Sequence, residues 1–155
     1  MLIQRCTLDQ HRLILPVSVS KPLLEQGNFI AQSTQTSFRG LVDTGAQRTV
    51  VSESVIANLG LVRTGHMEFG GLHGSKTHSR YLASIGIWAH RIDNKSGFKD
   101  ITTNELSLYT IEAPFEVVNM NDNTNFDLIL GFDVLKLFSF RFDCGDTTFE
   151  ITVSA

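Results

Sequence analysis

The sequence predicts a mostly β fold, a small closed antiparallel β-barrel with two short helices. Apolar and polar residues alternate along several short segments, which is the period of a half-buried strand. Glycine, asparagine and aspartate, which favour turns, separate these segments. A chain of 155 residues has the length of one domain. We therefore expect residues 1–155 to form a single domain.

Two strands are predicted before Asp43. Residues 13–20 alternate between apolar and other side chains. Pro16 within them has no amide donor, which favours an edge strand or a bulge. Residues 21–31, with Pro22 and Gly27, form a connection, and residues 33–42 form the second strand.

The first helix is predicted directly after a short strand at residues 49–51. Ser52 is a good N-cap residue, and Gly60 has the residue type that most often ends a helix. One helix face between them is apolar, with Val55, Ile56 and Leu59. This spacing predicts a helix of about two turns.

A long hairpin is predicted over residues 61–88. Its tip contains three glycines within the five residues 70–74, a composition that allows positive φ angles and mobility. The polar residues 90–107 follow, with their strongest turn pattern at Asp93 to Gly97. We therefore expect an insertion at about 90–107.

The last part of the chain predicts four further strands and a second helix. Residues 115–118 form a strand, and residues 127–131 form a buried strand that ends in glycine. Asp133 can begin a short helix after it. Alternating phenylalanines at 138–142 and the apolar residues of 149–153 predict a closing hairpin.

Composition and charge exclude several classes of function. Thirteen Lys and Arg against sixteen Asp and Glu give a net charge of −3, which lacks the basic surface of a nucleic-acid-binding protein. No apolar run approaches the roughly 20 residues of a membrane span, and the first residues lack a signal-peptide pattern. Cysteines and histidines fit no zinc-ligand spacing. We expect a cytoplasmic protein without metal, cofactor, nucleic-acid or membrane partner.

One segment has the composition of a catalytic loop. Leu41 to Ala46 places the Asp43 carboxylate where a buried strand turns into a tight loop. The Thr44 hydroxyl can donate and accept hydrogen bonds and so hold the loop. Gly45 has no side chain, which lets backbone amides and a substrate approach the carboxylate. Ala46 is too small to crowd its neighbour.

The order of three motifs resembles the retropepsin-like aspartic peptidases. The motifs are Asp43-Thr44-Gly45-Ala46, the glycine-tipped hairpin, and Ile129-Leu130-Gly131 before a short helix. The resemblance covers about residues 13–153 and implies the barrel of that family, with the hairpin as a flap over the site. The resemblance assigns catalysis to Asp43, Thr44 and Gly45, and support of the active site to Ile129, Leu130 and Gly131. The substrate-binding residues that it implies are Ala46, Phe69, Gly70, Gly71, Leu72, His73 and Gly74.

The resemblance also implies a homodimer. Each chain of such an enzyme contributes one Asp-Thr-Gly loop and one flap, and this sequence contains one such loop. Two Asp43 carboxylates, one per chain, would share a proton and activate a water molecule. The implied reaction is hydrolysis of an extended peptide or protein substrate, without a metal or a covalent intermediate.

Two pairs of residues differ from the retroviral members of the family. Gln47 and Arg48 stand where those members have acidic residues, and Phe132 and Asp133 stand where they have Arg-Asn. The exchange suggests an ion pair between Arg48 and Asp133. The closing hairpin at 138–153 replaces a single terminal strand, so we expect a different dimer interface.

Two other hypotheses are open on the sequence alone. The same fold could be a catalytically inactive dimerisation or peptide-binding module, although the joint presence of Asp43, Thr44 and Gly45 favours an enzyme. The chain could also be a monomeric barrel that binds a small ligand. Substitution of Asp43 would abolish hydrolysis but not peptide binding, which distinguishes the first two.

Overall fold

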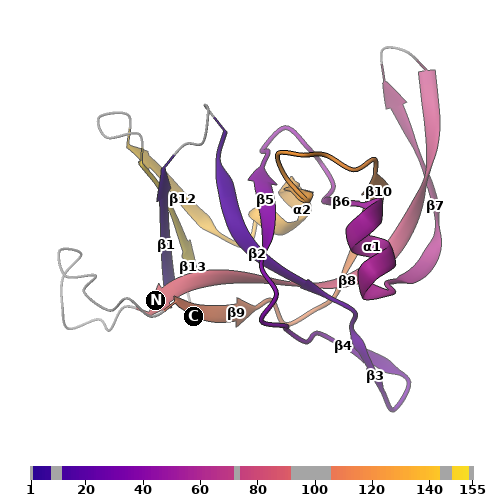
Figure 1. Cartoon of the computed structure of the whole chain (residues 1–155), viewed down its shortest axis with the longest axis horizontal. Coiled ribbons are helices and arrows are strands. Elements are labelled where there is room, and N and C mark those ends of the chain that lie inside the picture. Colours follow the sequence, from indigo (N-terminus) through magenta and orange to yellow (C-terminus); the bar gives the residue numbers. More distant parts are fainter. Residues whose placement is uncertain (1, 8–11, 72–73, 92–105, 144–147, 154–155) are drawn as a thin grey trace.

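The computed structural model describes residues 2–7, 12–71, 74–91, 106–143 and 148–153, and they form a mostly β structure (Figure 1). This confirms the mostly β class predicted from the sequence. In the described part of the chain, no helix has the length and apolar content needed to span a membrane. The predicted insertion falls largely on residues 92–105, which lie outside the described residues.

The described residues contain thirteen strands and two helices. In chain order they are β1 (Leu2–Thr7), β2 (Ile14–Ser20), β3 (Leu23–Glu25), β4 (Asn28–Ile30), β5 (Phe38–Val42), β6 (Val50–Ser52), α1 (Glu53–Leu59), β7 (Val62–Gly71), β8 (Gly74–Arg91), β9 (Leu106–Thr110), β10 (Phe115–Met120), β11 (Leu128–Leu130), α2 (Phe132–Leu135), β12 (Ser139–Asp143) and β13 (Thr148–Val153).

Six strands form a ring of hydrogen-bonded neighbours. The order is β8, β2, β5, β11, β6 and β10, and β10 pairs with β8 again. Two pairs in the ring, β11 with β5 and β10 with β6, are parallel, and these parallel pairs were not predicted for the antiparallel barrel. Two parallel strands must be joined by a long crossover connection. The chain between β5 and β11 is such a connection, and it contains the hairpin of β7 and β8.

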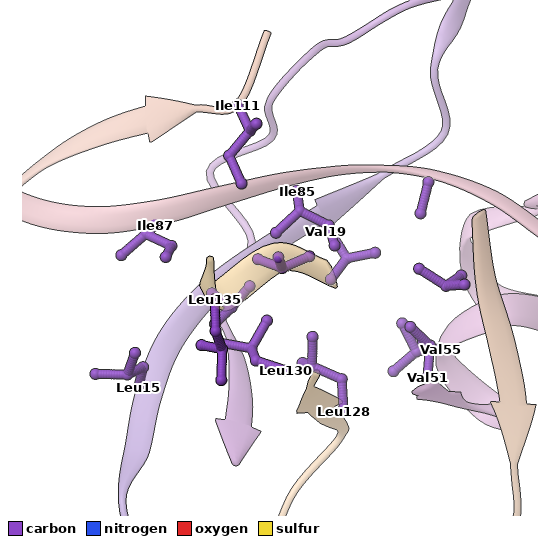
Figure 2. Packing of buried hydrophobic residues seen from close by; sticks show 14 of the residues in the cluster. Leu15, Val19, Val51, Val55, Ile85, Ile87, Ile111, Leu128, Leu130 and Leu135 are labelled. Atoms are coloured by element: carbon purple, nitrogen blue, oxygen red, sulfur yellow. The ribbon is translucent and has the colours of Figure 1, made fainter. Parts of the chain in front are cut away.

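The core lies inside this ring. Figure 2 shows Leu15, Val19, Ile85, Leu130 and Leu135 pointing into a common apolar cluster from different elements. Leu15, Ile85 and Leu130 are fully buried, and burial of such a side chain contributes about 1.5–3 kcal/mol. The two ends of β11 are therefore fixed by the core, and the residue after β11 begins the candidate site.

The long hairpin has the predicted form. The arms β7 and β8 pair from Val62 to Gly71, with an irregularity between Arg63 and Gly65. In the view of Figure 1, the hairpin extends from the ring toward the upper edge, as does the connection between β5 and β6. Leu72 and His73 of the predicted tip lie outside the described residues.

The structure also contains strands that the sequence analysis did not predict. A two-stranded sheet, β3 with β4, occupies the predicted connection at 21–31. The strand β9 pairs with β8 at the end of the predicted insertion, and β1 pairs with both β13 and β8. Outside the ring, the sheet therefore continues through β1, β13 and β12, which include the predicted closing hairpin.

Candidate active site

Asp43 lies one residue beyond β5, at the end where β5 and β11 run parallel. The register pairs Val42 with Leu130, the last residue of each strand. The Asp43 backbone N–H donates to the Leu130 carbonyl oxygen over 3.2 Å. The Asp43 side chain is half-buried. The apolar residues of β5 thus hold this carboxylate at the end of the sheet, accessible to solvent.

The loop after Asp43 folds back onto its carboxylate. The Gly45 N–H donates to Asp43 Oδ1 over 2.9 Å, and the Ala46 N–H donates to the Asp43 carbonyl oxygen over 3.2 Å. A Cβ atom at Gly45 would lie 3.2 Å from Oδ1, which is closer than ordinary van der Waals contact. The absence of a side chain at Gly45 therefore permits the bond that orients the carboxylate.

Gly131 packs directly under the same loop. A Cβ atom there would lie 2.3 Å from the Arg48 carbonyl carbon and 2.7 Å from the Thr49 nitrogen, so only glycine fits. The next residue, Phe132, donates its N–H to the Ala46 carbonyl oxygen over 2.7 Å. The first turn after β11 and the Asp43 loop are thus packed against each other.

Thr49 and Asp133 join the two segments through their side chains. The Thr49 hydroxyl donates to Asp133 Oδ1 over 2.8 Å, and the Thr49 N–H donates to Oδ2 over 3.1 Å. The same hydroxyl accepts the Gly131 N–H over 3.0 Å. Asp133 Oδ1 also accepts the Val134 N–H over 2.9 Å, within the first turn of α2. We refer to these bonds of Thr49, Gly131 and Asp133 as the loop lock.

The loop lock was not predicted from the sequence. Thr49 was assigned only to a short strand, although it is fully buried. The suggested Arg48–Asp133 ion pair is not among the salt bridges of the described residues; Thr49 and Val134 bind the Asp133 carboxylate instead. Two positions in the sequence could have indicated this contact: Thr49, shortly after the Asp-Thr-Gly motif, and Asp133, two residues after Gly131.

The supporting residues Ile129 and Leu130 meet the Asp43 loop as expected from their positions. Ile129 pairs with Leu41 on one side and with Val50 on the other, so β11 lies between the two ends of the loop. Leu130 is fully buried. Thr44, in contrast, is exposed at the tip of the loop, and its hydroxyl has no hydrogen bond to another described residue. Within the described chain Thr44 does not hold the loop.

The hairpin is held by an aromatic contact near the Gly71 end of its arms and by an asparagine farther from that end. Phe69 and His78 face each other across the hairpin in a T-shaped contact, with ring centroids 5.6 Å apart. Asn119 on β10 accepts the Ser79 N–H over 2.8 Å through its Oδ1 and donates from Nδ2 to Glu53 Oε1 over 2.9 Å. Of the residues predicted to bind substrate, Phe69 has a described side-chain contact, and it is half-buried.

The remaining hairpin residues are placed by their pairings alone. Gly70 pairs with Ser75, and Gly71 pairs with Gly74. Leu72 and His73 belong to the predicted substrate-binding set and lie outside the described residues. Among the described residues, no three His, Cys, Asp or Glu side chains are grouped as a metal site requires.

Comparison with known proteins identifies the family. The family model described as aspartyl protease matches residues 30–134, more than half of the chain, and the chain belongs to this family. Its structure is similar to that of a retropepsin-like aspartic protease from Rickettsia conorii, with a TM-score of 0.55 at 12% identity over 97% of this chain and 92% of the other.

A second solved structure is similar over a smaller part of the fold. The retroviral protease-like domain of Ddi1 from Leishmania major has a TM-score of 0.43 at 17% identity, over 86% of this chain and 82% of that domain. No curated protein matches the sequence. The family match and the fold together confirm the retropepsin-like resemblance predicted from the three motifs.

Proposed function

We propose that this protein is an aspartic endopeptidase that is active as a homodimer. The observation that carries the proposal is the half-exposed Asp43 carboxylate, which the Gly45 N–H orients at the end of β5. Membership of the aspartyl protease family supports the same reaction class. Asp43, Thr44 and Gly45 form the catalytic loop in this proposal.

The second carboxylate is contributed by a second copy of the chain. The sequence contains one Asp-Thr-Gly loop. Asp133, the carboxylate joined to this loop, binds Thr49 with both oxygens and therefore cannot act on a substrate. A two-fold axis between two Asp43 side chains supplies the missing group. The exposed Thr44 hydroxyl then lies near the axis, where it can bond to the partner's loop.

The reaction follows from the proximity of two like charges. Two neighbouring carboxylates do not both ionise readily, so they share one proton. The ionised Asp43 takes a proton from a water molecule between them, while the protonated Asp43 donates to the carbonyl oxygen of the scissile bond. The resulting tetrahedral diol collapses when the amine nitrogen is protonated, and the amine leaves.

The hairpin of β7 and β8 acts as the flap. An extended peptide adds to its edge through backbone hydrogen bonds, and closure excludes water from the site. Ala46, Phe69, Gly70, Gly71, Leu72, His73 and Gly74 bind the substrate in this arrangement. The contact of Phe69 with His78 joins the two arms of the flap near Gly71 and Gly74.

Cleavage of a proteome-derived peptide library, followed by mass spectrometry, tests the proposal. The assay is run between about pH 4 and pH 8, the range over which a shared-proton pair changes state, at a concentration where sedimentation shows a dimer. Asp43→Asn keeps an oxygen for the Gly45 N–H but removes the acid, and we expect it to abolish cleavage. Asp122→Asn, the same change on an exposed loop, is the matched control and keeps its cleavage sites.

Absence of Asp43-dependent cleavage from a demonstrated dimer would contradict this function. Peptide binding that persists in both the native chain and Asp43→Asn would then favour the inactive peptide-binding module.

A further inference from the structure

The hairpin of β7 and β8 leaves the ring at Arg80. The strand β8 pairs with β10 from Ala83 to Arg80, and within the described sheet its residues 74–79 pair with β7 alone. Figure 1 shows the two arms extending beyond the ring. Any movement of the hairpin relative to the ring must therefore bend it near Arg80.

The opposite arm is irregular at the same level. Arg63 pairs with Tyr81 and Gly65 pairs with Arg80, so Thr64 is an additional residue in β7. A bulge of this kind bends a strand and increases its local twist. Gly65 has a φ of 154°, which residues with a side chain rarely adopt, and a Cβ atom there would lie 3.0 Å from Arg80 Nη2. The sequence therefore permits a bend where the hairpin leaves the ring.

A single carboxylate on β10 holds both arms at this bulge. Glu116 Oε1 accepts a hydrogen bond from the Thr64 hydroxyl over 3.1 Å, and Glu116 Oε2 accepts one from Arg80 Nη1 over 3.0 Å. The Glu116 backbone pairs with Leu82, in the part of β8 that belongs to the ring. We call this contact of Glu116 with Thr64 and Arg80 the hairpin clamp.

The hairpin clamp is held by a small free energy. The side chains of Arg80 and Glu116 are 30% and 37% exposed, and a partly exposed ion pair contributes little to stability. Arg80 Nε is buried and has no acceptor among the described residues, which is a free-energy cost of the present arrangement. The clamp can therefore open and close without disruption of the core.

Beyond the clamp, the hairpin is bound to the ring through Asn119 of β10. Asn119 Oδ1 accepts the Ser79 N–H over 2.8 Å, and the Asn119 carbonyl oxygen lies 3.1 Å from His78 Nδ1. For residues 66–69, 76 and 77, the hydrogen bonds and ring contacts of the described chain stay within the hairpin. The outer part of the hairpin, residues 66–71 and 74–78, is therefore joined to the ring only near its inner end within the described chain.

We propose that Thr64, Gly65 and Arg80 form the pivot of the hairpin, and that Glu116 is a positioning residue that sets the angle at this pivot. The outer part turns as one unit, because its arms pair without a further irregularity and an aromatic contact joins them. The role of this unit as a flap rests on the proposed peptidase function, whereas the position of the pivot does not.

The strand that carries Glu116 is also bound to the catalytic loop. The Val118 N–H donates to the Thr49 carbonyl oxygen over 3.1 Å, and β10 pairs with β6, which begins directly after Thr49. Thr49 belongs to the loop lock. The pivot is therefore fixed relative to the loop that carries Asp43, and the angle at the pivot sets the distance between the outer part and Asp43.

Amide hydrogen exchange of the full chain, measured by NMR without substrate, tests this inference. The Ser79 N–H binds Asn119, so its exchange reports detachment of the hairpin from β10. N–H groups alternate in direction along a strand, so the His78 N–H points to β7, where Met67 is its partner, and its exchange reports separation of the arms. Glu116→Ala should accelerate exchange at Ser79 about threefold or more, as loss of a partly exposed ion pair does, and leave exchange at His78 unchanged.

Further variants show whether the clamp acts as a unit. Arg80→Ala should accelerate exchange at Ser79 as Glu116→Ala does, and the double variant should add little to either change. Glu116→Gln keeps an acceptor for Thr64, should have a smaller effect, and provides the same comparison if Glu116→Ala does not fold. Glu112→Ala removes an exposed glutamate that has no hydrogen bond with another described residue, and this matched control should leave exchange at Ser79 unchanged.

Three results would overturn the inference. Unchanged exchange at Ser79 in the Glu116 variants would show that the clamp does not hold the hairpin. Equal acceleration at Ser79 and His78 would show that the arms separate instead of turning as one unit. Equal acceleration at Ser79 and at the fully buried Ile85 would show a general loss of stability. The exchange rates do not depend on peptide cleavage, so failure of this inference is distinguishable from failure of the proposed function.

Discussion

At the scale of single residues, the Asp43 loop is held by contacts that lie outside its Asp-Thr-Gly motif. Asp43 and Gly45 are recognisable from the sequence because the motif and its order identify a family. Thr49 and Asp133 are separated by 84 positions in the sequence. Their side chains meet only because β11 lies between β5 and β6 in the folded chain. Local sequence patterns therefore identified the Asp43 motif but not the residues that fix its loop.

Removal of the Thr49 hydroxyl should destabilise the protein. Thr49→Val has a similar volume but leaves the Gly131 N–H without its acceptor and removes one of the two donors to Asp133 Oδ1. A buried polar group left without a partner costs about 1–3 kcal/mol. We expect a loss of this size in the free energy of unfolding by urea denaturation. Thr49→Ser retains the hydroxyl and should lose less than half as much; equal losses would contradict the role of the hydroxyl.

A methyl group at Gly131 should disturb the catalytic loop. Gly131→Ala brings a carbon atom within 2.5 Å of the Arg48 carbonyl oxygen, so the loop must move. Overpacking of this kind costs about 1–3 kcal/mol, and we expect a lower midpoint in urea together with loss of peptide cleavage. Gly27→Ala, in the turn between β3 and β4, adds backbone strain at a φ of 82° but meets no neighbouring atom, so it should leave cleavage unchanged.

At the scale of elements, the strand and helix patterns were predicted where the repeat is long. The arms β7 and β8, the helix α1 and the closing hairpin of β12 and β13 agree with the apolar spacing. The short strands β3 and β4 were missed because three residues per strand are too few to display a period. The strand β9 was missed because it begins in a polar stretch and is stabilised by β8.

Pro16 was predicted to mark an edge strand or a bulge, and this prediction is wrong because β2 has a described neighbour on each side. Within the described sheet, β2 lies between β5 and β8, but its two neighbours pair with different halves of it. Pro16 pairs with Arg39 on β5, whereas pairing with β8 begins at Val17. The proline therefore occupies a part of the strand with one described neighbour, where an absent amide donor is tolerated.

The helix α1 is capped from a distant loop. Ser52 occupies the N-cap position but makes no side-chain cap hydrogen bond, contrary to its predicted role. Asp122, beyond the end of β10, accepts the Ser54 N–H over 2.9 Å. This hydrogen bond with the Ser54 backbone, followed by one with its side chain, lowers the pKa of Asp122 below its ordinary value of 3.8.

The contact between Asp122 and Ser54 should stabilise the protein only while the Asp122 carboxylate is ionised. Because the pKa is lower in the folded chain, the stabilisation is present above pH 3.8 and is lost as the pH falls through the folded value. Asp122→Ala should lower Tm at pH 7, and the difference from the native chain should shrink below pH 3.8. Thermal unfolding between about pH 2.5 and pH 7 measures it. A difference in Tm that does not change with pH would exclude the charge as its cause.

At the scale of the whole molecule, the proposed active site requires two chains. Activity should therefore depend on the concentration of the protein, because dilution favours the separate chains. A constant specific activity through a dilution range in which sedimentation shows dissociation would contradict the shared site.

Mixed dimers provide a sharper measurement. Asp43→Asn chains should pair with native chains and inactivate them, since each mixed dimer retains one acid. With random pairing of equal amounts, the activity per native chain should fall to about half. Addition of Asp122→Asn chains, which keep Asp43, should not reduce it. Unchanged activity after the partners have exchanged would show that one chain suffices.

The position of β11 also has a consequence for synthesis of the protein on the ribosome. The strand that separates β5 from β6 is made long after both, and Gly131 and Asp133 reach Thr49 only after Leu128 to Leu130 have inserted. A nascent chain that ends before this point contains the whole Asp-Thr-Gly motif but neither its supporting strand nor the hydrogen bonds that orient it. Until β11 has been synthesised, the growing polypeptide therefore lacks the contacts that join the Asp43 loop to the rest of the fold.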